Sequence, residues 1–184
     1  MVRPRDQSLL DNPHLARRRT IEDREQTLVS GAFSDDGDRA LTVGSVLVHN
    51  TAGSSAIQRA TYLYWVRDGE EWRLDADSST VHALTENFLR AVREADTESA
   101  AAYITPSRRS LAGGRLLVDR FGWMPDEPAV NRQFEDVRVE VAPDGRHATS
   151  WAVWVLLGAE GEKALVEIPW VKGEGSWWID LPRG

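Results

Sequence analysis

The sequence contains no cysteine, which excludes disulfide bonds and thiol chemistry. It also lacks an apolar run near the ~18 residues that a membrane-spanning helix needs. The first residues, Met1 to Arg5, are not followed by the apolar stretch of a secretory signal. We therefore expect a cytoplasmic protein with no membrane contact, although a trimmed form of an exported protein would read the same.

Positive charge is scarce, because 22 basic residues stand against 29 acidic ones and the net charge is -7. This balance argues against nucleic-acid binding. The one basic cluster, Arg17 to Arg19, is followed directly by Glu22 and Asp23, so we interpret it as a solvated surface.

Motifs for metals and phosphates are also missing. The four histidines, His14, His49, His82 and His147, are scattered without the spacing of metal ligands, and we expect ordinary surface or strand histidines. Gly113-Gly114 is followed by no phosphate-binding Lys-Ser/Thr pair. We expect no metal and no cofactor.

Tryptophan, by contrast, is abundant, with eight residues. Two of them open a segment that occurs twice. Residues 65–75, from Trp65 to Asp75, return as residues 170–180 with Trp, Val, a cation, a second Trp and a closing Asp in register. Similarity at a fixed offset indicates an internal repeat.

The first copy of the repeat lies in a region that predicts strands alone. β-branched residues and an Asp68-Gly69 turn predict four of them: residues 27–30, 39–48, 58–67 and 71–75. A polar arm, residues 1–24, precedes them.

The arm shows weak helical character around residues 8–18, and the clearest helix is predicted after the strand region. Asp77 to Thr80 are N-cap residues that open a helix with an apolar stripe of 3.6-residue period. A second helix, residues 98–104, ends at Thr105-Pro106, and a further turn is expected to stop at Gly113-Gly114 before an irregular stretch, residues 116–127. Four strands follow, residues 134–141, 147–157, 163–172 and 177–181, which makes an α+β pattern.

The phrases Phe88-Leu89-Arg90-Ala91, Thr105-Pro106 and Trp177-x-Ile179-Asp180 resemble the nuclear transport factor 2-like superfamily, nearest to its SnoaL-like and related uncharacterised bacterial branches. The resemblance covers about residues 79–183. It implies a cone of curved antiparallel sheet packed on N-terminal helices, with a pocket between them. The expected organisation is therefore an arm (1–24), a partial strand repeat (25–77) and a nuclear transport factor 2-like domain (78–184).

The cone implied by the resemblance gives candidate pocket residues: Tyr103, Trp151, Trp154 and Trp170. Enzymes of the superfamily place a carboxylate or histidine inside it. Here strand alternation turns Glu167 and Asp180 outward, because their neighbours form the apolar, helix-facing set.

Trp178 is the candidate interface residue, since alternation turns it outward too while Trp177 and Ile179 face the helices. Its cover would be a second chain, in the homodimer that the resemblance implies, or the sheet of residues 25–77. We therefore expect a non-catalytic module that binds an apolar small molecule or a protein. The alternative is a small-molecule isomerase, cyclase or dehydratase of SnoaL or ketosteroid-isomerase type.

Overall fold

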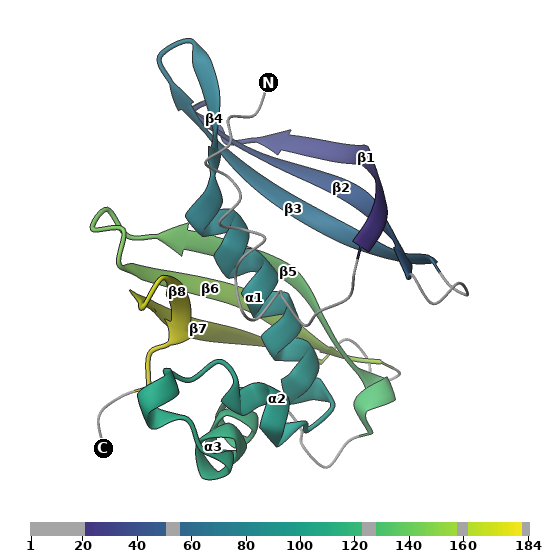
Figure 1. Cartoon of the computed structure of the whole chain (residues 1–184), viewed down its shortest axis with the longest axis vertical. Helices are drawn as coiled ribbons and strands as arrows, with labels where there is room; N and C mark the ends of the chain where they lie inside the picture. The colour runs from purple at the N-terminus through teal and green to yellow at the C-terminus, as the bar shows by residue number, and fades with distance from the viewer. Residues whose placement is uncertain (1–20, 51–55, 123–127, 158–161, 182–184) are drawn as a thin grey trace. The chain divides into compact units, whose positions relative to one another are not determined.

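The computed structural model describes residues 21–50, 56–122, 128–157 and 162–181 (Figure 1). The chain divides into two compact units, residues 1–83 and 84–184, and each is described by itself. Residues 1–20 of the predicted arm lie outside the described residues. Residues 21–24, which the prediction assigned to the arm, belong to the first strand.

The first unit contains a four-stranded antiparallel sheet whose strands follow chain order: β1 (Ile21–Phe33), β2 (Arg39–Asn50), β3 (Ala56–Asp68) and β4 (Glu71–Asp75). All four predicted strands are confirmed, and β1 is much longer than its β-branched residues indicated. The turns between β1 and β2 and between β3 and β4 hold Gly37 and Gly69 at φ 72° and 63°, a region that favours glycine.

Helix α1 (Ala76–Arg93) begins directly after β4, earlier than predicted. The side chain of Asp75 accepts hydrogen bonds from the Ser78 backbone N–H at 3.0 Å and the Ser78 hydroxyl at 2.7 Å. Asp75 therefore caps the helix, not the Asp77–Thr80 cluster, because one carboxylate satisfies two donors of the first turn.

Two shorter helices follow in the second unit, α2 (Thr97–Ala101) and α3 (Leu111–Phe121). The predicted stop at Gly113-Gly114 is wrong, because α3 runs through both glycines. A Cβ on Gly114 would clash with the Thr97 carbonyl oxygen and lie 2.9 Å from the Ala101 Cβ. Gly114 permits close packing of α2 and α3, and neither glycine ends the helix.

The second sheet is also antiparallel and in chain order: β5 (Arg132–Val141), β6 (His147–Leu156), β7 (Lys163–Gly173) and β8 (Ser176–Ile179). These four strands confirm the predicted ones. In β6, buried residues alternate with partly exposed ones from Ala148 to Leu156, so one face of the sheet is covered and the other is not.

The hairpins β3–β4 and β7–β8, which contain the repeated sequence, have the same register. Trp65 lies opposite Leu74 in the first sheet, and Trp170 lies opposite Ile179 in the second. Their surroundings differ, since Trp72 is 39% exposed and its counterpart Trp177 is 2% exposed. The shared register therefore does not give the two tryptophans the same burial.

The core lies in the second unit. Among the described side chains, Val81 is the one buried apolar residue before Leu84, whereas residues 84–179 contribute all the others, with Leu84, Phe88 and Trp170 almost fully buried. Two antiparallel sheets and three α-helices confirm the α+β class. No helix within the described ranges is long and apolar enough to cross a membrane.

Candidate functional site

An aromatic cluster fills the interior of the second unit, and two of the predicted pocket residues belong to it. Phe88 of α1 lies at its centre, with ring centroids 5.3 Å from Tyr103 and 6.5 Å from Trp170. Tyr103 and Trp170 also contact each other edge to face at 6.4 Å. These T-shaped arrangements are the ones that aromatic quadrupoles favour. The predicted pocket residues are packed against one another.

A neutral polar centre lies beside this cluster. Ser150 of β6 accepts hydrogen bonds at 2.8 Å from the Trp170 indole N–H and from the Thr85 hydroxyl. Thr85 and Ser150 are both 0% exposed. The three groups satisfy one another inside an apolar interior, which fixes α1 against β6 and β7. Hydroxyl and indole groups of this kind can orient a partner but do not ionise near neutral pH.

Trp154 is buried in the same interior but has other partners. Its indole N–H donates to the Phe121 carbonyl oxygen at 3.0 Å, and its ring meets Phe134 edge to face at 5.8 Å. Since Phe121 is the last residue of α3 and also contacts Phe88 at 5.6 Å, Trp154 joins α3 to the sheet. Its contacts are those of a core residue.

Trp151 lies on the opposite face of the sheet from the other three predicted pocket residues. It is partly exposed and pairs across the strands with Glu167, to which its indole N–H donates at 3.3 Å. Its position between the buried Ser150 and Ala152 fixes this orientation, because alternate residues of a strand point to opposite faces. The structure does not bring Trp151 into the predicted pocket.

Trp178 corrects a second expectation. The prediction was an outward indole covered by a second chain or by the sheet of residues 25–77, and Trp178 is only 4% exposed in the single chain. Its N–H donates to the Gly173 carbonyl oxygen at 2.8 Å, and the Arg109 guanidinium lies 5.8 Å from its ring. Contacts within the chain thus cover the surface on which the predicted interface role depended.

Acidic side chains stay out of the core of the second unit. Among its described residues, the buried polar side chains are Thr85, Arg132, Ser150 and Ser176. Glu167 and Asp180 are exposed, as alternation predicted. Within the described part of the chain, no group of three His, Cys, Asp or Glu side chains could hold a metal ion.

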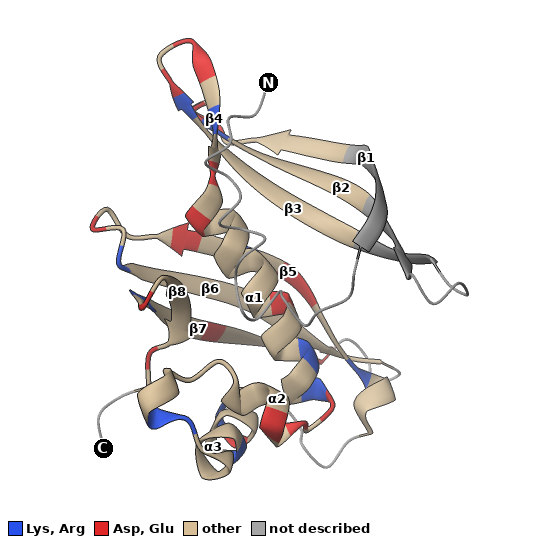
Figure 2. Cartoon of the chain, in the orientation of Figure 1, with Lys and Arg blue, Asp and Glu red and all other residues tan. Residues whose placement is uncertain are grey.

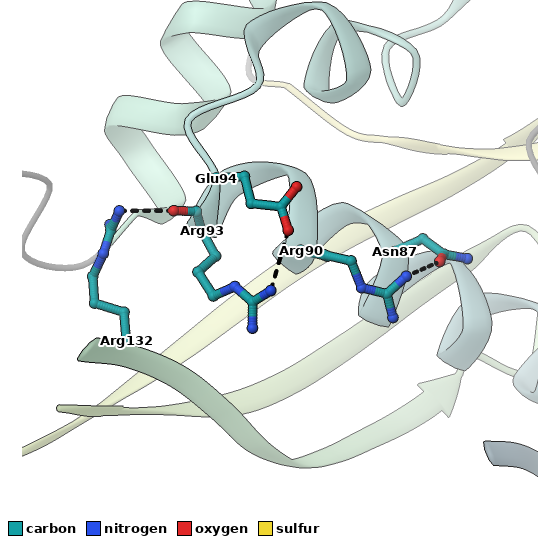
Figure 3. Close-up of polar contacts among 5 residues, drawn as sticks. All are labelled: Asn87, Arg90, Arg93, Glu94 and Arg132. Carbon is teal, nitrogen blue, oxygen red and sulfur yellow. Dashed lines mark hydrogen bonds and ion pairs between the residues drawn. The ribbon is translucent and has the colours of Figure 1, made fainter. Parts of the chain in front are cut away.

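Three arginines lie near the C-terminal end of α1, and each of them contacts another residue of the chain (Figure 3). Arg132, 3% exposed, donates to the Arg93 carbonyl oxygen at 2.8 Å, and Arg93 pairs with Glu94 at 3.1 Å. Arg90 donates to the Asn87 side chain at 3.1 Å. A buried guanidinium at the negative end of a helix is a C-terminal cap.

A buried histidine that contacts two tyrosines in the first unit was not predicted from the sequence. His82 is 2% exposed on α1, so the prediction of a surface or strand histidine is wrong. Its Nδ1 lies 2.9 Å from the Tyr64 hydroxyl oxygen, and its ring stacks on Tyr62 at 4.1 Å. The signal was present, because Tyr62 and Tyr64 are two residues apart on a strand and must share a face.

Comparisons with known proteins add little to this description. The sequence matches no known protein family, and no curated protein matches it. A solved structure described as "Ntf2 like protein involved in plasmid conjugation" is 9% identical and aligns over 86% of this chain and 75% of its own, with a TM-score of 0.31. At that score the likeness transfers neither fold nor function, so the account rests on the chain's own residues.

Proposed function

We propose that the second unit is a non-catalytic, nuclear transport factor 2-like module that binds a protein through the outer face of its sheet. In the simplest case that protein is a second copy of the chain. The observation that carries the proposal is Leu165, which is 71% exposed near the start of β7.

Leu165 belongs to the outer face, which is the side of the sheet that points away from the buried residues of β6 and β7 and carries apolar side chains along β6 and at several positions of β7. It pairs with Val153, and Val153 alternates with Trp151 and Val155 along β6. All are partly exposed or exposed: Trp151, Val153, Val155, Leu165, Pro169 and Val171. Contiguous apolar surface of this kind marks interaction sites.

Charges on the outer face fit self-association. Lys163 forms an ion pair with Glu135 at 2.5 Å. Trp151 lies between Arg138 of β5 and the exposed Glu167 of β7 in one row across the three strands. Because both signs are present, two copies of the face can be placed without like charges meeting. A stable dimer buries ~800 Å² on each partner, which a four-stranded face can supply.

The interior supports a non-catalytic role. General acid-base catalysis in an apolar cone needs a carboxylate or histidine there, with its pKa tuned by burial. The described core of the second unit holds hydroxyls and one arginine instead, and the rings of Phe88, Tyr103 and Trp170 contact one another.

Leu165→Arg tests the proposal. A guanidinium within the interface would have to lose its hydration, so the variant should be monomeric by light scattering with an unchanged melting temperature. Val130→Arg is the matched control, because Val130 is 76% exposed but lies before the sheet, at residues 129–131. If Leu165→Arg leaves the mass of a dimeric wild type unchanged, the outer face is not the interface.

A further inference from the structure

Another apolar surface lies on the sheet of the first unit. Its most exposed part is a pair of aromatic rings. Phe33 is 71% exposed and Trp72 is 39% exposed, with ring centroids 5.8 Å apart and planes at 59°. They come from β1 and β4, the two edge strands of the sheet. Neighbouring strands of a flat sheet lie ~4.8 Å apart, so β1 and β4 would be separated by three such spacings. Because the two ring centroids are much closer than that, the two side chains extend toward each other across the sheet.

The register explains how the rings meet. Phe33 pairs with Ala40, Ala40 with Trp65, and Trp65 with Leu74 in one row across the four strands. Ala40 has no side chain beyond Cβ, which leaves room for a ring above it. Trp65 is itself held in place, because its indole N–H donates to the Thr42 hydroxyl at 2.9 Å.

This aromatic face points away from α1. Tyr62 and Tyr64, whose rings contact His82 of α1, alternate along β3 with Leu63 and Trp65. His82 thus lies on one side of the sheet and the aromatic face on the other. Leu63, Trp65 and Leu74 remain partly exposed there.

The end of the sheet beside the rings is acidic. The β1–β2 and β3–β4 turns are joined by the Arg67 backbone N–H, which donates to the Asp38 carbonyl oxygen at 2.8 Å. Acidic residues colour the tip of the β3–β4 hairpin red in Figure 2. Six exposed carboxylates occur here: Asp35, Asp36, Asp38, Asp68, Glu70 and Glu71. Three exposed arginines accompany them: Arg39, Arg67 and Arg73.

The geometry points to this aromatic face, with its acidic rim, as a docking site for a basic, apolar segment of a partner protein. Apolar side chains of the segment would pack on Phe33 and Trp72, and its lysines or arginines would face the carboxylates. Charge selects this occupant, since the excess of carboxylates would repel a second copy of the rim, nucleic acid or an anionic membrane.

The test uses the full chain and a fluorescent ten-residue peptide of alternating leucine and lysine, with binding followed by anisotropy at low salt. A leucine–glutamate peptide and a serine–lysine peptide are the controls. We expect the leucine–lysine peptide alone to bind well, with an affinity that falls as salt is added. Equal binding of either control peptide would overturn the proposal, as would no binding of the leucine–lysine peptide.

Variants locate the binding site. Phe33→Ser should weaken peptide binding about fivefold or more, because truncating an aromatic anchor removes its contact area. The matched control Val130→Ser removes an equally exposed apolar side chain, at 76%, from the second unit and should change nothing. Glu70→Gln combined with Glu71→Gln should weaken binding at low salt, and serves as the second variant if Phe33→Ser lowers the melting temperature.

Two results would assign the face to another occupant and overturn the proposal. One is a halved particle mass on Phe33→Ser, which would place a second copy there. The other is peptide binding that occurs only after residues 1–20 are removed, which would place the chain's own net-basic N-terminal segment there.

Discussion

Arg132 is a single residue on which the end of α1 depends. Its guanidinium is buried and donates to the last carbonyl oxygen of the helix, on Arg93. Replacing Arg132 with alanine leaves that carbonyl without this donor and removes a positive charge from the helix C-terminus. We expect a loss of about 1–3 kcal/mol in the free energy of unfolding, measured by urea denaturation.

Arg132→Lys is the informative companion variant. Lysine keeps the charge but not the planar fork of donors, so it should recover only part of the lost stability. If Arg132→Ala unfolds at the same urea concentration as the wild type, the cap contributes nothing and this account of the helix end is wrong.

Asp144, in the β5–β6 turn, provides a prediction about pH. Hydrogen bonds from the Arg146 backbone N–H and the His147 side chain lower its pKa to about 2. Because the folded pKa lies below the unfolded value, the associated stability is present above about pH 4 and is lost as the pH falls toward 2.

A carbon NMR titration of the Asp144 carboxyl should therefore give a midpoint near 2. The difference in melting temperature between the wild type and Asp144→Ala should shrink between about pH 4 and 2. A midpoint at the ordinary value for aspartate would show that the turn hydrogen bonds do not persist in solution.

At the scale of elements, α2 and α3 approach each other at Gly114. A Cβ there would meet the Thr97 carbonyl oxygen, which is backbone and cannot move aside cheaply. Gly114→Ala should therefore destabilise the protein by about 1–3 kcal/mol, although alanine is the better helix former.

Gly113→Ala is the control in the same turn of α3. Its Cβ would lie 2.6 Å from the Ile104 Cδ1, the flexible end of a side chain that can turn away. Its thermal unfolding should change less than that of Gly114→Ala. A melting temperature for Gly114→Ala above that of the wild type would mean that the helices are not packed this closely.

The strands could be predicted from the sequence because the two-residue alternation of side chains depends only on neighbouring residues. Alternation placed Glu167 and Asp180 outside the core, and Asp68-Gly69 marked the turn of the β3–β4 hairpin. For Trp178, alternation gave the direction of the side chain but not the residues that cover it. The cover includes Arg109, 69 residues earlier in the chain.

Other features depended on contacts that no local pattern contains. A glycine pair stops a helix or permits close packing, and only the position of Thr97 decides between the two for α3. In the same way, the burial of His82 follows from Tyr62 and Tyr64, which lie on a strand nearly twenty residues earlier. Sequence alone did not join these segments.

For the whole molecule, the difference between the cores of the two units predicts that only one of them folds when expressed alone. Nearly all buried apolar side chains among the described residues belong to the second unit. A fragment of residues 75–184, which keeps the Asp75 cap, should therefore unfold cooperatively on heating. Residues 1–74 alone should not, because a lone sheet leaves an apolar face in water. A sharp thermal transition of the shorter fragment as a monomer would contradict this.

The central claim is that the second unit associates through its outer face, and sedimentation of the unmodified chain tests it most directly. The account predicts a mass twice that of the 20.6 kDa chain at micromolar concentrations, falling toward 20.6 kDa on dilution. A mass that stays at 20.6 kDa at the highest attainable concentration would contradict it.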